Sequence, residues 1–205
     1  MRTRQMAAVA VLLLGAAACT AQQPRQARAV PPARPSASPS SPSCEAGALR
    51  WGTVRQETRL TALSPVVTVG GHDGWTTFRN IPLRTVTASL HTDGVRVPQR
   101  RVMASLTRHL GYDTGDLMSP GENTAHHPRP PERIGSQDAG RLATAEAVRV
   151  VDASFAVECP GGTHYGSVTT WLGATRGDTL ACGADPGGEA WLREAYRLAC
   201  GPLSR

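Results

Sequence analysis

The sequence predicts an α+β fold, in which a mostly antiparallel sheet or sandwich carries one inserted helix and one C-terminal helix. Three observations lead to this prediction. Short runs rich in Val, Thr and Leu, separated by glycine-rich turns, occupy residues 48–90 and again 148–182. A stretch with helical periodicity follows each of these regions. Four cysteines lie in the same part of the chain, which predicts two disulfides in an exported protein.

The strands of the first half are short. Their residues are mainly Val, Thr, Leu and aromatics, and glycine-rich segments at 70–74 and 93–94 supply the turns between them. We therefore expect strands at Ala48–Val54, Arg59–Leu63, Val66–Val69, Trp75–Phe78 and Leu83–Leu90.

The clearest strand pattern of the second half lies at Val148–Cys159. Apolar residues such as Phe155 and Val157 alternate there with polar ones such as Asp152, as expected for a strand with one buried face. Further strands are expected at 165–172 and 178–182, with a turn at 176–177 between them.

The inserted helix is predicted between Pro98 and Gly111. Proline suits the first turn of a helix and glycine suits the position after its end. Val102, Met103, Leu106 and Leu110 form an apolar stripe, which should face the sheet. The arginines of this segment fall on the other side, where a solvated polar face explains them: Arg100, Arg101 and Arg108.

The C-terminal helix is predicted to begin after Asp185, a suitable N-cap, and to end before Gly201. Glu189 and Arg193 have the spacing of an ion pair along a helix. The side of this helix that should pack on the sheet consists of Trp191, Leu192, Ala195, Tyr196, Leu198 and Ala199.

Four cysteines allow three pairings. We favour Cys182–Cys200, which would join the end of a strand to the end of the last helix. The other pair would then be Cys44–Cys159, joining the first strand to the central one. Catalytic or metal-binding thiols are the competing interpretation, but the sequence contains no CxxC motif.

The first 18 residues have the features of a secretory signal peptide. Two arginines lie in Met1–Gln5, and the 13 residues Met6–Ala18 are apolar or small. A basic segment, a short apolar segment and small residues before a cleavage site are typical of such a signal, and the apolar stretch is too short to span a bilayer. The chain is therefore expected to be exported.

The end of this leader resembles the lipobox of bacterial lipoproteins, because the small residues Ala16, Ala17 and Ala18 precede Cys19. In that family the cysteine is lipidated and becomes the mature N-terminus. The resemblance implies that Cys19 carries the lipid and anchors the protein at the extracytoplasmic face of the cell membrane. The family usually has Leu where this chain has Ala16, and 16–18 also fit ordinary signal cleavage, so free secretion is the alternative.

The five cysteines support the lipidated form, because removing Cys19 leaves an even set of four. All 22 basic residues are arginine, and Ala, Gly and Pro are abundant. This composition is similar to that of exported lipoproteins of high-GC Gram-positive bacteria whose roles are uncharacterised.

Residues 19–43 are expected to be a disordered tether, since they are rich in Pro, Ser and Gln and hold almost no large apolar side chain. Residues 44–205 should form a single disulfide-stabilised domain. Five of the 22 basic residues lie in the leader and the tether, which leaves 17 against 16 acids in the domain. We expect no nucleic-acid partner, because a protein that binds nucleic acid concentrates its positive charge in the folded domain.

The irregular stretch 111–140 is the first place to look for a site, because a loop of that length inside a compact domain is usually functional or disordered. His126 and His127 lie in it, and His72 and His164 lie near other turns. These four histidines are weak candidates for Zn²⁺ or Cu²⁺ ligands, but no HxxxH, HEXXH or HxH spacing joins them.

No motif for nucleophilic catalysis is present either, since the sequence lacks GxSxG and SxxK. We therefore expect a membrane-anchored, non-enzymatic binding or interaction module at the cell envelope, with no cofactor and with a cell-wall or protein partner. The alternative is a small cell-envelope hydrolase or metal-dependent enzyme that uses the loop histidines.

Overall fold

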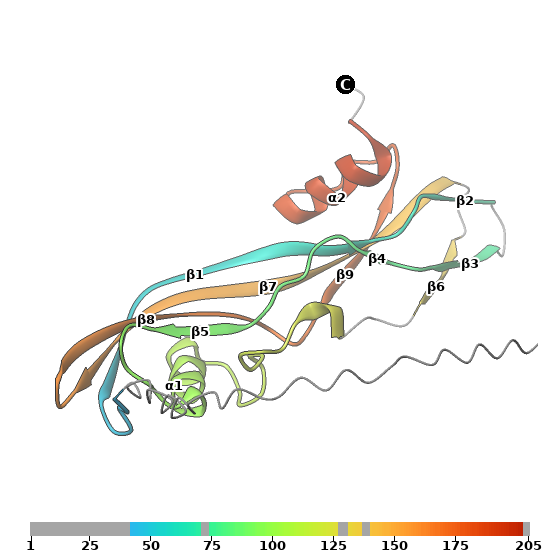
Figure 1. Ribbon diagram of the computed structural model, residues 1–205. Coiled ribbons are helices and arrows are strands. Elements are labelled where there is room, and N and C mark those ends of the chain that lie inside the picture. Colours follow the sequence, from blue (N-terminus) through green and yellow to red (C-terminus); the bar gives the residue numbers. More distant parts are fainter. Residues whose placement is uncertain (1–41, 71–73, 127–130, 137–139, 203–205) are drawn as a thin grey trace, which may run out of the picture. The chain divides into compact units, whose positions relative to one another are not determined.

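A computed structural model describes residues 42–70, 74–126, 131–136 and 140–202. The predicted signal peptide, Cys19, nearly all of the tether, His72 and His127 lie outside these residues. Within them the prediction of an α+β fold is confirmed: the structure is mostly antiparallel sheet, with one internal and one C-terminal helix (Figure 1).

The central strand of the sheet is β7 (Gly140–Cys159), which exceeds the predicted strand by eight residues at its start. On one side of β7 lie β1 (Ala48–Leu63) and then β2 (Val67–Val69). On the other side β8 (Gly162–Trp171) pairs with residues 150–159 and β9 (Arg176–Ala181) pairs with residues 142–147. All of these pairings are antiparallel, so β7 holds the domain together from end to end.

Shorter strands complete the sheet and form a separate ribbon. β5 (Ser89–Thr92) pairs with β8, and β4 (Ile81–Pro82) pairs with the end of β1. The two strands β3 (Gly74–Phe78) and β6 (Glu132–Ser136) pair only with each other in the described residues. A 3₁₀ helix, η1 (Thr124–His126), precedes β6.

Several local predictions of strands and turns differ from the structure. The segment Leu83–Leu90 was expected to be one strand, but only its last two residues lie in a strand, at the start of β5. The polar residues 55–58 were expected to separate two strands, but they pair with β7 inside the single strand β1. Arg176 and Gly177 were expected in a turn, but they pair with Ala147 and Glu146. The stretch 111–140, expected to be irregular, includes β6. At 55–58 and 176–177 the long strand β7 overrides the local signals, because ladder hydrogen bonds offset weak strand propensity.

The inserted helix is α1 (Gln99–Leu110), as predicted. Gly111 follows it with a φ of 71°, a left-handed conformation that favours glycine. Val102, Met103 and Leu106 are buried, and with Phe155 and Val157 of β7 they belong to one apolar cluster. The apolar stripe therefore packs on the sheet as expected.

The C-terminal helix is α2 (Ala190–Cys200), which begins later than predicted. Asp185 is not its N-cap, because its carboxylate accepts a hydrogen bond from the Gly187 N–H in a tight turn before the helix. The predicted Glu189–Arg193 ion pair is also wrong. The Glu189 carboxylate instead accepts hydrogen bonds from Arg176 at 3.0 Å and from the Trp191 indole at 2.6 Å.

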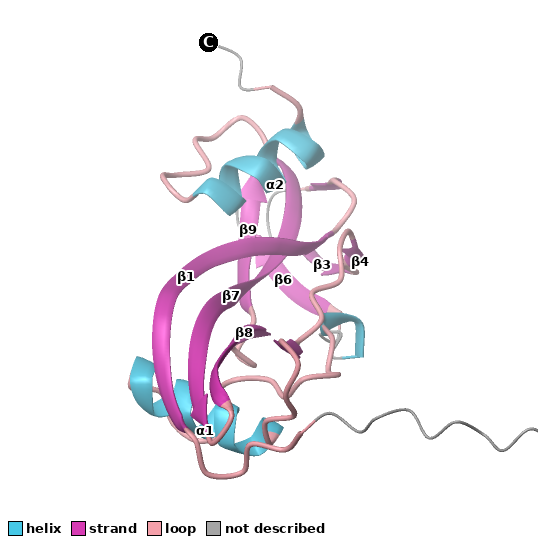
Figure 2. Ribbon diagram, turned by 60° about the vertical axis from the view of Figure 1, so that its left-hand side comes forward, coloured by secondary structure: helices cyan, strands magenta, loops and turns pink. Residues whose placement is uncertain are grey.

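The buried side of α2 is mostly as predicted. Trp191, Ala195 and Tyr196 are buried, whereas Leu198 is 56% exposed, contrary to expectation. Ala145 and Ala147 of β7 belong to the same apolar cluster as Trp191 and Ala195. Odd-numbered residues of β7 thus belong to both helix clusters, with α2 covering its first half and α1 its second half (Figure 2).

Both predicted disulfides are confirmed. Cys44–Cys159 joins the start of the domain to the end of β7, with 5.7 Å between the Cα atoms. Cys182–Cys200 joins the segment after β9 to the end of α2, with 5.3 Å between the Cα atoms. Each helix-covered end of β7 therefore has its own covalent cross-link.

Candidate functional site

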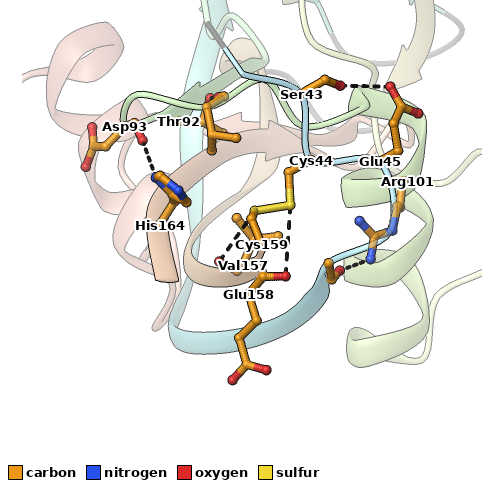
Figure 3. Close-up of a disulfide and its surroundings, with 12 residues drawn as sticks. Ser43, Cys44, Glu45, Thr92, Asp93, Arg101, Val157, Glu158, Cys159 and His164 are labelled. Atoms are coloured by element: carbon orange, nitrogen blue, oxygen red, sulfur yellow. Dashed lines mark hydrogen bonds between the residues drawn. A yellow bond between two sulfur atoms is a disulfide. The ribbon is translucent and has the colours of Figure 1, made fainter. Parts of the chain in front are cut away.

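Of the four candidate histidines, the structure describes the side chain of His164 alone. His164 is half-buried on β8, where its Nδ1 lies 3.2 Å from the Asp93 backbone oxygen (Figure 3). His126 lies in η1, and the structure does not describe its side chain. Among the side chains that are described, no three of His, Cys, Asp or Glu come together as a metal site.

The chain enters the domain beside the start of α1. The Pro42 oxygen accepts a hydrogen bond from the Arg96 N–H at 2.8 Å, and the Cys44 N–H donates to the Arg96 oxygen at 2.9 Å. Arg101 donates to the Gly47 oxygen in the same region (Figure 3). Arg101 is therefore half-buried and holds the N-terminal segment against α1, contrary to its expected place on a solvated face.

An open groove runs along α1, between this helix and the segment that follows it. Its volume is about 660 Å³, within the range of ligand-binding pockets. The helix contributes two parallel rows of side chains, and the segment 112–119 forms the facing wall. The lining residues are Gln99, Arg100, Met103, Ala104, Thr107, Arg108, Tyr112, Thr114, Gly115, Leu117 and Ser119.

The floor of the groove is apolar and its rim is basic. Met103 and Leu117 are buried beneath it, whereas Arg100 and Arg108 are exposed on the helix. These two arginines are eight residues apart, which corresponds to about 12 Å along a helix. Ala104 lies midway between them and leaves open space above the floor.

The two arginines of the rim have no ion pair among the described side chains. Asp113 and Asp116 belong to the facing segment, but neither lines the groove, and the Asp116 carboxylate accepts a hydrogen bond from the Asp113 N–H at 2.9 Å. No acidic residue lines the groove. Neither Arg100 nor Arg108 is within 4.0 Å of a carboxylate among the described side chains. Arg108 makes one long contact of 3.4 Å, from Nε to the Ala104 oxygen of its own helix. The groove is therefore a site where two guanidinium groups face solvent over an apolar surface.

The wall of the groove is fixed in place. The Tyr112 hydroxyl donates to Gln56 of β1 at 2.8 Å, and the Gln99 amide donates to the Pro120 oxygen at 3.4 Å. The Met118 N–H donates to the Trp171 oxygen at 2.9 Å, and the Thr170 hydroxyl donates to the Met118 oxygen at 2.7 Å. These contacts preform the groove, which lowers the entropy cost of binding.

A second and smaller hollow, on the even-numbered face of β7, is partly open. It has room for a few water molecules, about 50 Å³. The Glu146 carboxylate lines it, is 8% exposed and accepts a hydrogen bond from the Asn80 amide at 2.6 Å. Asn80 in turn accepts from the Thr144 hydroxyl at 2.8 Å. Glu146, Asn80 and Thr144 are thus joined by hydrogen bonds, as buried polar groups usually are.

The segment 111–140, which the sequence indicates as a place for a site, contributes one wall of the groove with its first third. The sequence analysis gave Arg100 and Arg108 no binding role. The spacing Arg100–Ala104–Arg108, one row at every fourth residue, was the signal that could have indicated a binding row on the helix.

Comparisons with protein-family models, with curated proteins and with solved structures found no match for this chain. Among the described residues, none of the helices has the length and apolar character needed to cross a membrane.

Proposed function

We propose that this protein is a lipid-anchored binding module on the extracytoplasmic face of the cell membrane. Cys19 would carry the lipid, residues 19–43 would form the tether, and the groove along α1 would hold the partner. The observation that carries the binding role is the preformed groove, with its apolar floor and its two arginines without an ion pair among the described residues.

The cysteine pairing supports the anchor. Cys44, Cys159, Cys182 and Cys200 pair among themselves, which leaves Cys19 without a partner inside the domain. An unpaired thiol is unusual in an exported protein, and lipidation would remove it. The disulfides also suit an oxidising compartment outside the cytoplasm.

The chemistry of the groove favours binding over catalysis. Its lining has arginines, hydroxyl groups and apolar side chains, and no His, Cys, Asp, Glu or Lys. A guanidinium group stays protonated in proteins, so it does not serve as a general base at neutral pH. The hydroxyl groups have no neighbouring base in the lining to activate them.

The anchor is tested by fractionating cells that express the wild-type chain, Cys19→Ala or Thr20→Ala. We expect the wild type and Thr20→Ala in the membrane fraction, with labelled palmitate incorporated, and Cys19→Ala in the medium without label. Thr20→Ala is the matched control, because it changes the neighbouring residue and keeps the cysteine. Membrane retention of Cys19→Ala would contradict lipidation at this position.

A further inference from the structure

The two arginines of the groove define the spacing of the charges that they would bind. Arg100 and Arg108 project from one row of α1, about 12 Å apart along the axis. In an extended peptide, residues four positions apart lie about 13 Å apart and point to the same side. Two acidic residues at this spacing would each meet one guanidinium group, which binds a carboxylate in a bidentate manner.

The residue midway between the two acids would point to the same side of the peptide. It would meet the groove at Ala104, above the buried Met103 and the facing Leu117. An apolar side chain fits this position, because the small Ala104 leaves room and the flexible Met103 adapts to shape. A polymer of glycerol phosphate has no apolar group for this surface, so the floor favours a peptide.

We propose that the groove binds an extended peptide segment of a partner protein in which two acidic residues, four positions apart, flank a central apolar residue. This proposal rests on the proposed binding function and names the class of partner. The tether is not the occupant, because residues 20–43 contain three arginines and no acid.

A second copy of this chain does not supply such a segment either. The only acidic residues four positions apart in the sequence are Asp185 and Glu189. Gly187 lies between them, so the central apolar side chain is missing, and the Glu189 carboxylate is already bonded to Arg176 and Trp191. The segment therefore belongs to another protein.

The test uses the chain from residue 20 onward. Its three apolar clusters and both disulfides lie within 44–200, so the domain carries its own core. The probe is a fluorescent peptide with the sequence Asp-Ser-Leu-Ser-Asp between glycine spacers, and binding is measured by fluorescence polarisation. We expect saturable binding that weakens as NaCl is added, because exposed charges are screened by salt.

Arginine variants and an isomeric peptide distinguish binding in the groove from general attraction between opposite charges. Arg100→Gln and Arg108→Gln should each weaken binding about fivefold, and the double variant about twentyfold. The matched control is Arg55→Gln with Arg197→Gln, which removes the same charge from two exposed positions outside the groove and should leave affinity unchanged. The isomer Asp-Asp-Ser-Leu-Ser should bind the wild type about as weakly as the original peptide binds the double variant, because its two charges are adjacent.

A charge-reversed variant shows whether loss of binding comes from the changed charge or from misfolding, because a misfolded protein would not gain a new ligand. The double variant Arg100→Glu with Arg108→Glu should lose the acidic peptide and gain Lys-Ser-Leu-Ser-Lys. Equal affinity of the wild type and the double glutamine variant would overturn the proposal, as would the absence of saturable binding. Binding of glycerol phosphate polymer without binding of the peptide would also overturn it. These results do not bear on the lipid anchor, which the fractionation of Cys19→Ala tests separately.

Discussion

The two ends of β7 have the same construction and use charged side chains differently. Each end is covered by a helix and fastened by a disulfide: α1 and Cys44–Cys159 at one end, α2 and Cys182–Cys200 at the other. At the α2 end, Glu189 binds Arg176 and Trp191. Glu194 binds Arg84 there, at 2.6 Å.

At the α1 end, Arg100 and Arg108 have no carboxylate partner within 4.0 Å among the described residues. At the α2 end, Glu189 and Glu194 form ion pairs with arginines of the domain, whereas Arg100 and Arg108 at the α1 end are exposed along a preformed groove. This difference supports the proposal that the partner binds at the α1 end.

The largest expected effects come from the two disulfides, which should differ in strength. Replacing Cys44 and Cys159 by Ser should lower the free energy of unfolding by about 5 kcal/mol, and replacing Cys182 and Cys200 by about 3 kcal/mol. The reason is loop length, since the sequence separations are 115 and 18 residues. Urea unfolding of both variants measures the order, and a reversed order would contradict this account.

The next effect tests the hydrogen bonds of Glu146 beside the small hollow. Asn80→Ala should cost about 2–3 kcal/mol, because it leaves the buried Glu146 carboxylate and the Thr144 hydroxyl without their shared partner. Arg79→Ala, at the exposed neighbouring position, is the control and should change stability by less than about 0.5 kcal/mol. Thermal unfolding followed by circular dichroism gives both values. An equal effect of the two substitutions would show that the cavity pairing contributes little.

A smaller effect is expected at the surface of the α2 end. Glu189→Ala should lower the free energy of unfolding by about 1 kcal/mol, because it removes the contacts to Arg176 and the Trp191 indole, both near the surface. Asp185→Ala is the control in the same segment, since its carboxylate contacts a single backbone N–H. Urea unfolding at low and high salt measures the difference, which should shrink as salt is added.

The smallest stability effect is expected at the α1 end. Arg100→Gln with Arg108→Gln should change the free energy of unfolding by less than about 0.5 kcal/mol, because neither arginine has an ion pair to lose among the described residues. The same variant should bind the acidic peptide about twentyfold more weakly. A large loss of stability would assign these arginines to the structure of the domain and would remove the contrast between the two ends.

The sequence predicted the elements that local patterns control. The apolar stripe of α1, Gly111 after its end, and the alternation around Phe155 all follow from residue periodicity and backbone preference. The pairing of the cysteines was predicted because their positions at element ends left few sensible choices.

The rest depended on contacts that no local pattern reveals. Residues 55–58 form strand only because β7 is long enough to pair with them. The partner of Glu189 is Arg176, 13 residues away, which competes successfully with the nearby Arg193. The groove likewise exists only because the segment 112–119 returns beside α1, held by Gln56 and by the Trp171 backbone.

The most direct test of the central claim is the titration of the Asp-Ser-Leu-Ser-Asp peptide into isotopically labelled protein, followed through the backbone amide signals in NMR spectra. We expect the largest shifts at Ala104, Thr107 and Gly115, which line the groove, and no change along α2. The double variant Arg100→Gln with Arg108→Gln should need about twentyfold more peptide to reach the same shifts. Shifts confined to α2, or equal shifts in the double variant at the same peptide concentration, would contradict the assignment of binding to the α1 end.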